Sequence, residues 1–473
     1  MLSPNFRRAN DLLFSAVLIA LGLGCAAGLY LAIAQAPLHI PLDPNEGWNA
    51  YHAAAAMSGA PLYPSPPSLM VNNYPPLSFY IVGLFGLLAG DNIVAGRLVS
   101  LLAFFAICGL IFVIARAMGA GKRESAFGAL LFAATLLLGS DYVGMNDPQL
   151  LGEAVSLSAV LVLVKAPRDA ARVAAAASLF VVAGFIKHNL VVMPLAAAIW
   201  LLLYAPRFAL LFVNVGLLLA GAAILAYGAV TGTNLLAELN SARGYSWASA
   251  SAGAWNWLGL AFAPLLGAAV LPLLDRDNPN VRFVAILAIL GVVSGYCFLG
   301  GAGVDVNAMF DADIALALAS ALLLARVSVR FKNEGVVAAL LAAPFAIVLY
   351  MAATPDWLTQ DFWLRPGADD AETARKNIAF LRAHPGPALC ETLSLCYWAG
   401  KNAEVDVFNL GEGFRTGARS DGQIVSLIRD KHYAAVEFET FSPFPLTERV
   451  RTALLSTYRV DHIDDNGVFL VPR

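Results

Sequence analysis

Long apolar runs separated by short charged breaks dominate the first three quarters of the chain. A membrane-spanning helix needs about 20 mostly apolar residues to cross roughly 30 Å of hydrocarbon. The pattern predicts eleven such spans, at residues 11–35, 94–118, 125–140, 149–164, 172–188, 190–204, 206–230, 253–273, 281–299, 308–326 and 335–353. A twelfth apolar stretch, 75–90, is short and begins Pro-Pro, so we interpret it as an interfacial or re-entrant helix.

The last 120 residues alternate short apolar and charged segments and hold 30 of the 63 Asp, Glu, Lys and Arg residues. Strand-like patterns cover 388–391, 406–409, 434–439, 459–463 and 468–471, and helical spacing covers 422–431 and 447–457. Asp465, Asn466 and Gly467 favour a hairpin turn between the last two strands. We therefore predict an α-helical polytopic membrane domain, 1–353, followed by a small α/β domain, 354–473.

Positive charge orients the predicted spans, because short cytoplasmic loops accumulate Lys and Arg. With the N-terminus in the cytoplasm, fourteen Lys and Arg residues of the membrane domain face the cytoplasm and only Arg97, Lys187 and Arg243 face the other side. Eleven spans then place the C-terminal domain outside the cytoplasm. We expect a multi-pass protein of the cell (inner) membrane, surrounded by membrane lipids, with a first outer loop over residues 36–93.

Composition narrows the possible classes of protein. Hydrophobic residues make up 59% of the chain, which excludes a disordered protein, and the net charge of −3 argues against nucleic-acid binding. No Cys and His spacing typical of a metal site is present, so we predict no metal residues and no firm cofactor, although a divalent metal stays open. A disulfide between Cys390 and Cys396 is permitted in an exported domain, and the sequence leaves it open.

Two carboxylates open the first outer loop, in the sequence Asp-Pro-Asn-Glu-Gly-Trp-Asn-Ala-Tyr-His from Asp43 to His52. Either Asp43 or Glu46 could act as a general base that takes a proton from an attacking hydroxyl. Alternatively, Asp43 caps a helix that starts at Pro44 and ends near Gly59, with Glu46 completing a capping box. The two interpretations are compatible, since a capping carboxylate keeps free lone pairs.

The order of these motifs resembles that of the GT-C glycosyltransferases. An N-terminal span precedes the acidic loop, which is followed by Gly-Ala-Pro-Leu-Tyr, Asn-Tyr-Pro-Pro-Leu-Ser-Phe-Tyr and Ala-Gly-Arg-Leu. The sequence is most similar to the bacterial protein-mannosyltransferase-like and aminoarabinose-transferase-like (family 39-type) subgroup. The resemblance implies a GT-C fold and inverting transfer of a sugar from a polyprenyl-phosphate donor to a lipid, glycan or protein acceptor of the cell envelope. It also implies that an acid of this loop is the base.

The match to the family is incomplete at two positions. Related loops often read Asp-Glu, and here that Asp falls on Asn45 with Glu46 retained, so the choice between Asp43 and Glu46 stays open, with a narrow preference for Asp43. Aminoarabinose enzymes carry Glu-Lys before Pro-Pro, where this chain has Asn73 and Tyr74. The lysine suspected of contacting phosphate is therefore missing, and other residues must hold the donor phosphate.

The few cations on the outer side are the candidates for that role, because a lipid phosphate is a fitting partner for them. We predict donor phosphate binding by Arg97, Lys187, His188 and Arg243. Each has an alternative: Arg97 could pair with Asp91 or another loop carboxylate, Lys187 could be a snorkelling anchor, and Arg243 could be a solvated charge.

Polar side chains on the same face are the candidates for binding the sugar or the acceptor. They are Asn49, His52, Asn72, Asn73, Tyr74, Asp147 and Asn307. Asp147 could instead cap the helix that follows Pro148. Two other classes of protein stay open: a transporter or lipid flippase, which predicts discontinuous spans, and a non-catalytic membrane subunit of an envelope-glycan assembly.

The predicted orientation can be tested by labelling single cysteines from outside the cytoplasm. We expect a membrane-impermeant maleimide to label Ser65→Cys in intact spheroplasts and to label Arg168→Cys only after the membrane is permeabilised. Labelling with the opposite preference would place the acidic loop in the cytoplasm and contradict the topology.

Overall fold

The computed structural model describes residues 4–65, 67–352 and 359–473, and a helix lies at each of the eleven predicted spans. These helices are α1 (Pro4–Gln35), α4 (Asn92–Ala117), α5 (Lys122–Gly139), α6 (Gln149–Lys165), α7 (Ala170–Ile186), α8 (Val192–Tyr204), α9 (Pro206–Thr231), α11 (Trp247–Leu274), α12 (Pro279–Phe298), α13 (Phe310–Arg330) and α14 (Glu334–Ala352). In the described part of the chain, seven helices are long and apolar enough to cross a membrane, and α7 and α8 are shorter apolar helices. The protein is therefore a multi-pass membrane protein.

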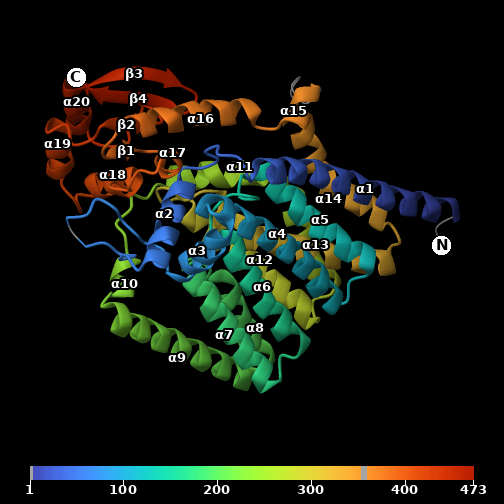
Figure 1. The fold of residues 1–473 in the computed structure, drawn as a ribbon. Helices are drawn as coiled ribbons and strands as arrows, with labels where there is room; N and C mark the ends of the chain where they lie inside the picture. Colours follow the sequence, from blue (N-terminus) through green and yellow to red (C-terminus); the bar gives the residue numbers. More distant parts are fainter. Residues whose placement is uncertain (1–3, 66, 353–358) are drawn as a thin grey trace.

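Helix α13 forms the centre of the bundle and packs against α5, α11 and α12 (Figure 1). Nearly all of its side chains are buried, in contrast to the largely exposed α9 and α1. Small residues permit this close packing: an added Cβ at Gly128 of α5 would lie 2.7 Å from the carbonyl oxygen of Ala317. The central position of α13 fixes the helices that carry the polar residues described below.

The loop of residues 36–93, which we call the first loop, contains two helices. They are α2 (Asn45–Ser58), which ends at Gly59, and α3 (Leu77–Ala89), which follows Pro75 and Pro76. Both helices end at a glycine with a φ of 76°, a left-handed conformation that glycine adopts readily. The predicted helix at 75–90 is thus found as α3. The short helices α10 (Leu235–Glu238) and η1 (Val306–Met309) lie in later loops.

The C-terminal domain is a small α/β unit, as predicted. Its described residues form a sheet in the order β1-β2-β4-β3, in which β1 and β2 are parallel and the other pairs antiparallel. The strands are β1 (Ala388–Cys390), β2 (Ala435–Phe438), β3 (Tyr458–Asp464) and β4 (Gly467–Pro472), and the helices are α15 (Gln360–Leu364), α16 (Ala368–Ala383), α17 (Leu393–Trp398), α18 (Val407–Arg415), α19 (Gly422–Arg429) and α20 (Glu448–Thr457). The expected hairpin joins β3 and β4.

One predicted strand of this domain is wrong. Residues 406–409 begin helix α18, because the Asp406 side chain accepts a hydrogen bond from the Asn409 amide and caps the helix. The sequence left open whether Cys390 and Cys396 are bonded. In the structure they form a disulfide that links β1 to α17.

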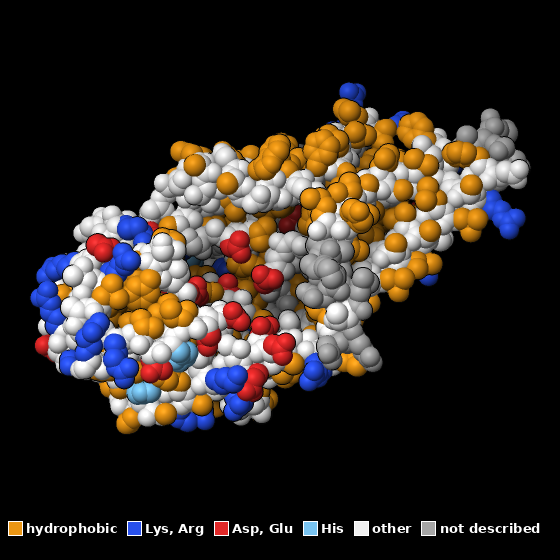
Figure 2. Space-filling view, turned by 90° about the horizontal axis from the view of Figure 1, so that it is seen from above, with side chains coloured by type: hydrophobic (Ala, Val, Ile, Leu, Met, Phe, Trp, Pro, Cys, Tyr) orange, Lys and Arg blue, Asp and Glu red, His pale blue; other side chains and the backbone are white. Residues whose placement is uncertain are grey.

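The C-terminal domain is joined to the first loop by polar and backbone contacts. Trp48 of α2 donates its indole N–H to Asp406 at 3.1 Å, and the hydroxyl of Tyr51 donates to the carbonyl of Lys401 at 2.7 Å. Leu69 pairs with Val405 in a parallel β-bridge and lies in the core of the C-terminal domain. Charged side chains gather over this end of the molecule, whereas the helices are covered mainly by hydrophobic ones (Figure 2).

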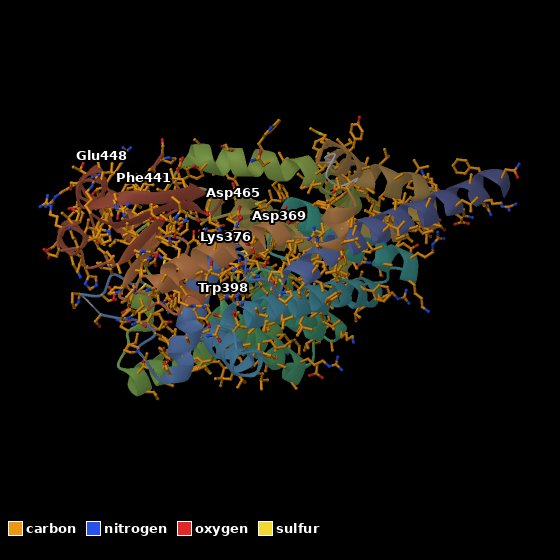
Figure 3. All side chains as sticks on the ribbon, turned by 45° about the horizontal axis from the view of Figure 1, so that its top comes forward. Asp369, Lys376, Trp398, Phe441, Glu448 and Asp465 are labelled. Carbon is orange, nitrogen blue, oxygen red and sulfur yellow. A yellow bond between two sulfur atoms is a disulfide. The ribbon has the colours of Figure 1, made fainter. Side chains whose placement is uncertain are left out.

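Helix α17 also contacts the start of α4. The indole N–H of Trp398 donates to Asp91, the N-cap of α4, at 2.9 Å. Figure 3 labels Trp398 where α17 meets the membrane helices. The first loop therefore contacts both the membrane helices and the C-terminal domain, and its conformation depends on both.

Gly47 of α2 tests the contact with α17. An added Cβ would lie 2.1 Å from the Ser394 amide nitrogen, so we expect Gly47→Ala to destabilise the protein by about 1–3 kcal/mol, the usual cost of overpacking. Thermal unfolding in detergent measures the effect. The matched control is Gly22→Ala in α1, where nothing lies within 4 Å and the melting temperature should stay the same or rise. Equal melting temperatures for both variants would contradict the described contact.

Candidate active site

A buried ion pair holds the start of α2 against α4. Arg97 donates from Nε to Glu46 Oε1 at 2.7 Å and from Nη2 to Oε2 at 2.5 Å, and both side chains are fully buried. Such a two-point contact combines charge attraction with fixed geometry. It explains why α2 begins where it does, since Glu46 lies in its first turn.

The remaining donors of Arg97 are bound to the backbone that leads into the first loop. Its Nη1 and Nη2 groups donate to the carbonyl oxygens of Leu38 at 2.8 Å and Ile40 at 2.6 Å, and Nη1 also reaches those of Gln35 and Ala36. All five N–H groups of Arg97 thus have a partner, which leaves none for a phosphate. The geometry favours the alternative role for Arg97, pairing with a loop carboxylate, and that carboxylate is Glu46 instead of Asp91.

Both carboxylate oxygens of Glu46 are also engaged in hydrogen bonds. In addition to Arg97, Oε1 accepts the Asn146 amide at 3.0 Å and Oε2 accepts the Leu42 amide at 3.2 Å. A general base needs a lone pair that can reach the proton it removes, and Glu46 is buried with both oxygens engaged. The arrangement assigns Glu46 a structural role.

Asp43 differs from Glu46 in each of these respects. It is half-buried, and its Oδ1 accepts the Asn45 amide at 2.8 Å, whereas Oδ2 makes no hydrogen bond to any described residue. Burial is the main cause that raises the pKa of Asp43 to about 6, and the charges of Asp147 and Glu46 add to the rise. The predicted capping box forms only in part, because Glu46 reaches the Leu42 amide and Asp43 caps Asn45.

Lys187 and Asp147 form a second buried ion pair, at 2.8 Å between Nζ and Oδ1. Asp147 also accepts the Gln149 amide at 2.7 Å, so it caps the start of α6 as the alternative interpretation expected. The ammonium of Lys187 lies over the ring of Tyr74, 5.2 Å from its centre. A snorkelling side chain would reach toward water, and Lys187 instead points into the protein.

Arg243 is the least engaged of the predicted phosphate-binding cations. Its Nη1 donates to the Ala302 carbonyl at 3.2 Å, its guanidinium lies 5.4 Å from the ring of Phe408, and its buried Nε has no partner among the described residues. Arg243 and Lys187 both lie within electrostatic range of Tyr74 and of the exposed His188. The structure therefore brings Lys187, His188 and Arg243 together, whereas the N–H groups of Arg97 are all engaged by Glu46 and backbone carbonyls.

Most of the predicted sugar-binding side chains support the backbone of this region. Asn49 donates to the Asn146 carbonyl, Asn72 to the Leu62 carbonyl, Asn73 to the Ser241 hydroxyl and Asn307 to Gln149, at 2.8 to 3.3 Å. The ring of His52 contacts the Trp48 carbonyl at 2.8 Å, and burial lowers its pKa to about 4. Tyr74 stays close to the cations.

Asn146, which was not among the predicted site residues, holds the loop before α6 against α2. Besides its amide contact with Glu46, its side chain donates to the Glu46 carbonyl at 3.1 Å, and its own carbonyl accepts from Asn49. The sequence signal for this loop was the run Asn146, Asp147, Pro148 and Gln149 at the start of the predicted span 149–164. Within the described residues, no group of three or more His, Cys, Asp or Glu side chains is placed to hold a metal ion.

Comparisons with known proteins find similarity in sequence to one family and in fold to one solved protein. Residues 73–230 match the sequence model of the dolichyl-phosphate-mannose-protein mannosyltransferase family. The fold is similar to ArnT from Cupriavidus metallidurans in the apo state, with a TM-score of 0.62 and 14% identity over 96% of this chain and 97% of that one. The same enzyme bound to undecaprenyl phosphate gives a TM-score of 0.60 and 14% identity over 97% of each chain. No curated protein matches the chain by sequence.

The arabinofuranosyltransferase AftD from Mycobacteria (mutant R1389S) gives a TM-score of 0.46 and 18% identity over 94% of this chain and 39% of that one. The fold of ArnT and the mannosyltransferase sequence match confirm the predicted GT-C resemblance. Residues 73–230 are thus similar in sequence to a glycosyltransferase family, and the fold of nearly the whole chain is similar to that of ArnT.

The buried pair of Glu46 and Arg97 predicts that substitutions of Glu46 and of Asp43 differ greatly in their effect on the free energy of unfolding. Glu46→Gln should lower the free energy of unfolding by about 3–5 kcal/mol, because it leaves the charge of Arg97 buried without a counter-charge. Asp43→Asn should change it by less than about 1 kcal/mol, since Asn can still accept the Asn45 amide. Thermal unfolding compares them, and a double variant, Glu46→Leu with Arg97→Met, should recover part of the loss. A fully stable Glu46→Gln would contradict the structural role.

Proposed function

We propose that this protein transfers a sugar from a polyprenyl-phosphate donor to a hydroxyl of a lipid, glycan or protein acceptor, and inverts the anomeric carbon. The observation that carries the proposal is the half-buried carboxylate of Asp43, whose Oδ2 has no hydrogen bond to any described residue and which lies within electrostatic range of Asp147, the partner of Lys187. The undecaprenyl phosphate in the structurally similar ArnT supports a donor of this kind. The proposal also places the first loop outside the cytoplasm, as the positive charges favour.

Asp43 acts as the general base in this mechanism. Its Oδ2 accepts the proton of the acceptor hydroxyl as that oxygen attacks the anomeric carbon. The bond between the anomeric carbon and the phosphate oxygen breaks, and the electron pair leaves with the lipid phosphate. Attack opposite to the leaving group accounts for inversion.

The leaving phosphate needs stabilisation of its developing charge rather than a proton. Arg243 is the main candidate, because its Nε has no partner in the described structure. His188 adds an exposed ring nitrogen, and Lys187 adds its positive charge through space while its ammonium stays bound to Asp147. Tyr74, which packs on Lys187, forms part of the wall beside these cations.

The sign of the pH dependence follows from the role of Asp43. A base works only when deprotonated, so kcat/KM should rise with pH and reach half its maximum near pH 6, the pKa of Asp43. Asp43→Asn should lower transfer by about 10²–10⁴-fold and remove this pH dependence. The assay measures transfer from a panel of undecaprenyl-phosphate sugars to envelope acceptors.

Asp370→Asn on the surface of α16 is the matched control, since its side chain is exposed and far along the chain from the first loop. It should retain full activity. An Asp43→Asn variant with the kcat of the unmodified protein would remove Asp43 from the mechanism.

A further inference from the structure

We infer that a cavity between α5, α11 and α13 binds the hydroxyl-rich head group of the acceptor, and that this head group carries no negative charge there. The inference rests on the proposed function and specifies its second substrate. The cavity has a volume of about 420 Å³ and opens beside the loop of Asp141 and the segment that leads into η1. This size lies within the usual range of small-ligand sites, about 300–1,000 Å³.

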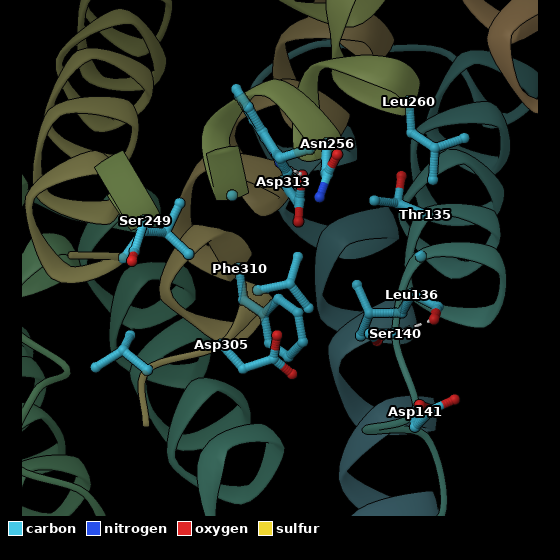
Figure 4. Close-up of a pocket in the computed structure, with 16 residues that line it drawn as sticks. Thr135, Leu136, Ser140, Asp141, Ser249, Asn256, Leu260, Asp305, Phe310 and Asp313 are labelled. Atoms are coloured by element: carbon cyan, nitrogen blue, oxygen red, sulfur yellow. Dashed lines mark hydrogen bonds between the residues drawn. The ribbon is translucent and has the colours of Figure 1, made fainter. Parts of the chain in front are cut away.

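The charges that line the cavity are all of one sign. Asp141, Asp305 and Asp313 contribute carboxylates, and the described lining residues include no Lys, Arg or His. Asn256 and Ser249 add neutral polar groups (Figure 4). Carboxylates accept hydrogen bonds from hydroxyl groups and repel phosphate, so the lining matches a sugar hydroxyl rather than an anion.

Asp313 shows that the polar lining is built into the fold. It lies in the first turn of α13, is only 5% exposed, and accepts the indole N–H of Trp257 at 2.8 Å through Oδ1. Its Oδ2 has no hydrogen bond from any described residue, although the side chain as a whole is buried. The Trp257 contact fixes the orientation of the carboxylate, and a bound hydroxyl would supply the missing partner.

The cavity adjoins the candidate active site through Tyr142. Phe310, which lines the cavity, packs against Tyr142 with ring centres 5.3 Å apart. Tyr142 lies within electrostatic range of Asp305 at the cavity and of Asp43 and Asp147 at the site. A head group held by Asp313 can therefore extend toward Asp43 along the side of Tyr142.

This placement separates the two substrates by charge. The donor phosphate belongs with Lys187, His188 and Arg243, and the acceptor belongs in the cavity that lacks cations. The acceptor atom that attacks is then a sugar hydroxyl and not a phosphate oxygen.

Cysteine protection tests the cavity directly and does not depend on transfer. The Asn256→Cys variant, in phosphatidylcholine nanodiscs free of glycoside detergent, is treated with N-ethylmaleimide, and each labelled peptide is quantified by mass spectrometry. At octyl glucoside ten times above its Kd, mass action predicts about tenfold slower labelling of the introduced thiol. Octyl phosphate at the same concentration should not slow it. The exposed native Cys297, which does not line the cavity, is the internal control and should react at one rate throughout.

Two further variants make the test specific. Asp313→Asn can still accept the Trp257 indole but loses the charge, and should weaken protection by octyl glucoside about tenfold. Asp305→Lys should allow octyl phosphate to protect. Equal protection by both compounds, or protection unchanged in Asp313→Asn, would overturn the inference. Sugar transfer without protection would refute the cavity alone, and protection without any transfer from undecaprenyl-phosphate sugars would refute the proposed function alone.

Discussion

The buried pair of Glu46 and Arg97 is the constraint on which the site depends. It ties α2 to α4, and through Leu38 and Ile40 it also fixes the backbone that connects α1 to the first loop. A buried pair contributes little net stability compared with apolar packing, but breaking it is costly. Its value here is positional, because Asp43 lies three residues from Glu46 and is held where the chain enters α2.

Spare hydrogen-bonding capacity separates the structural charges from the reactive ones. Glu46 and Arg97 have their polar atoms engaged by neighbours, whereas Asp43 and Arg243 each keep an atom without a partner in the described structure. The unengaged pair also has the chemistry that the reaction needs, one acceptor for a proton and one donor for a phosphate. Residues whose polar atoms all have hydrogen-bond partners hold the structure of the site, and residues with an unpartnered polar atom can bind the substrates.

The sequence predicted the elements better than the pairing between them. Apolar runs located eleven helices and α3, because hydrophobicity and length are local properties. The roles of Asp43 and Glu46 could not be separated, since the partners of Glu46 come from residues 97 and 146, far along the chain. The strand predicted at Asp406 is wrong for a similar reason. The apolar residues next to Asp406 favour a strand, but its side chain caps α18 and accepts a hydrogen bond from the distant Trp48 indole.

The C-terminal domain contacts the segments that form the candidate site. It receives Leu69 into its core, engages Trp48 and Tyr51 of α2, and its Glu412 accepts the Gly244 amide next to Arg243 at 2.8 Å. The domain thus contacts both the helix that follows the proposed base and the loop that carries the proposed phosphate ligand. Because these two segments are nearly 200 residues apart in sequence, their contacts with one common domain help to fix the position of each.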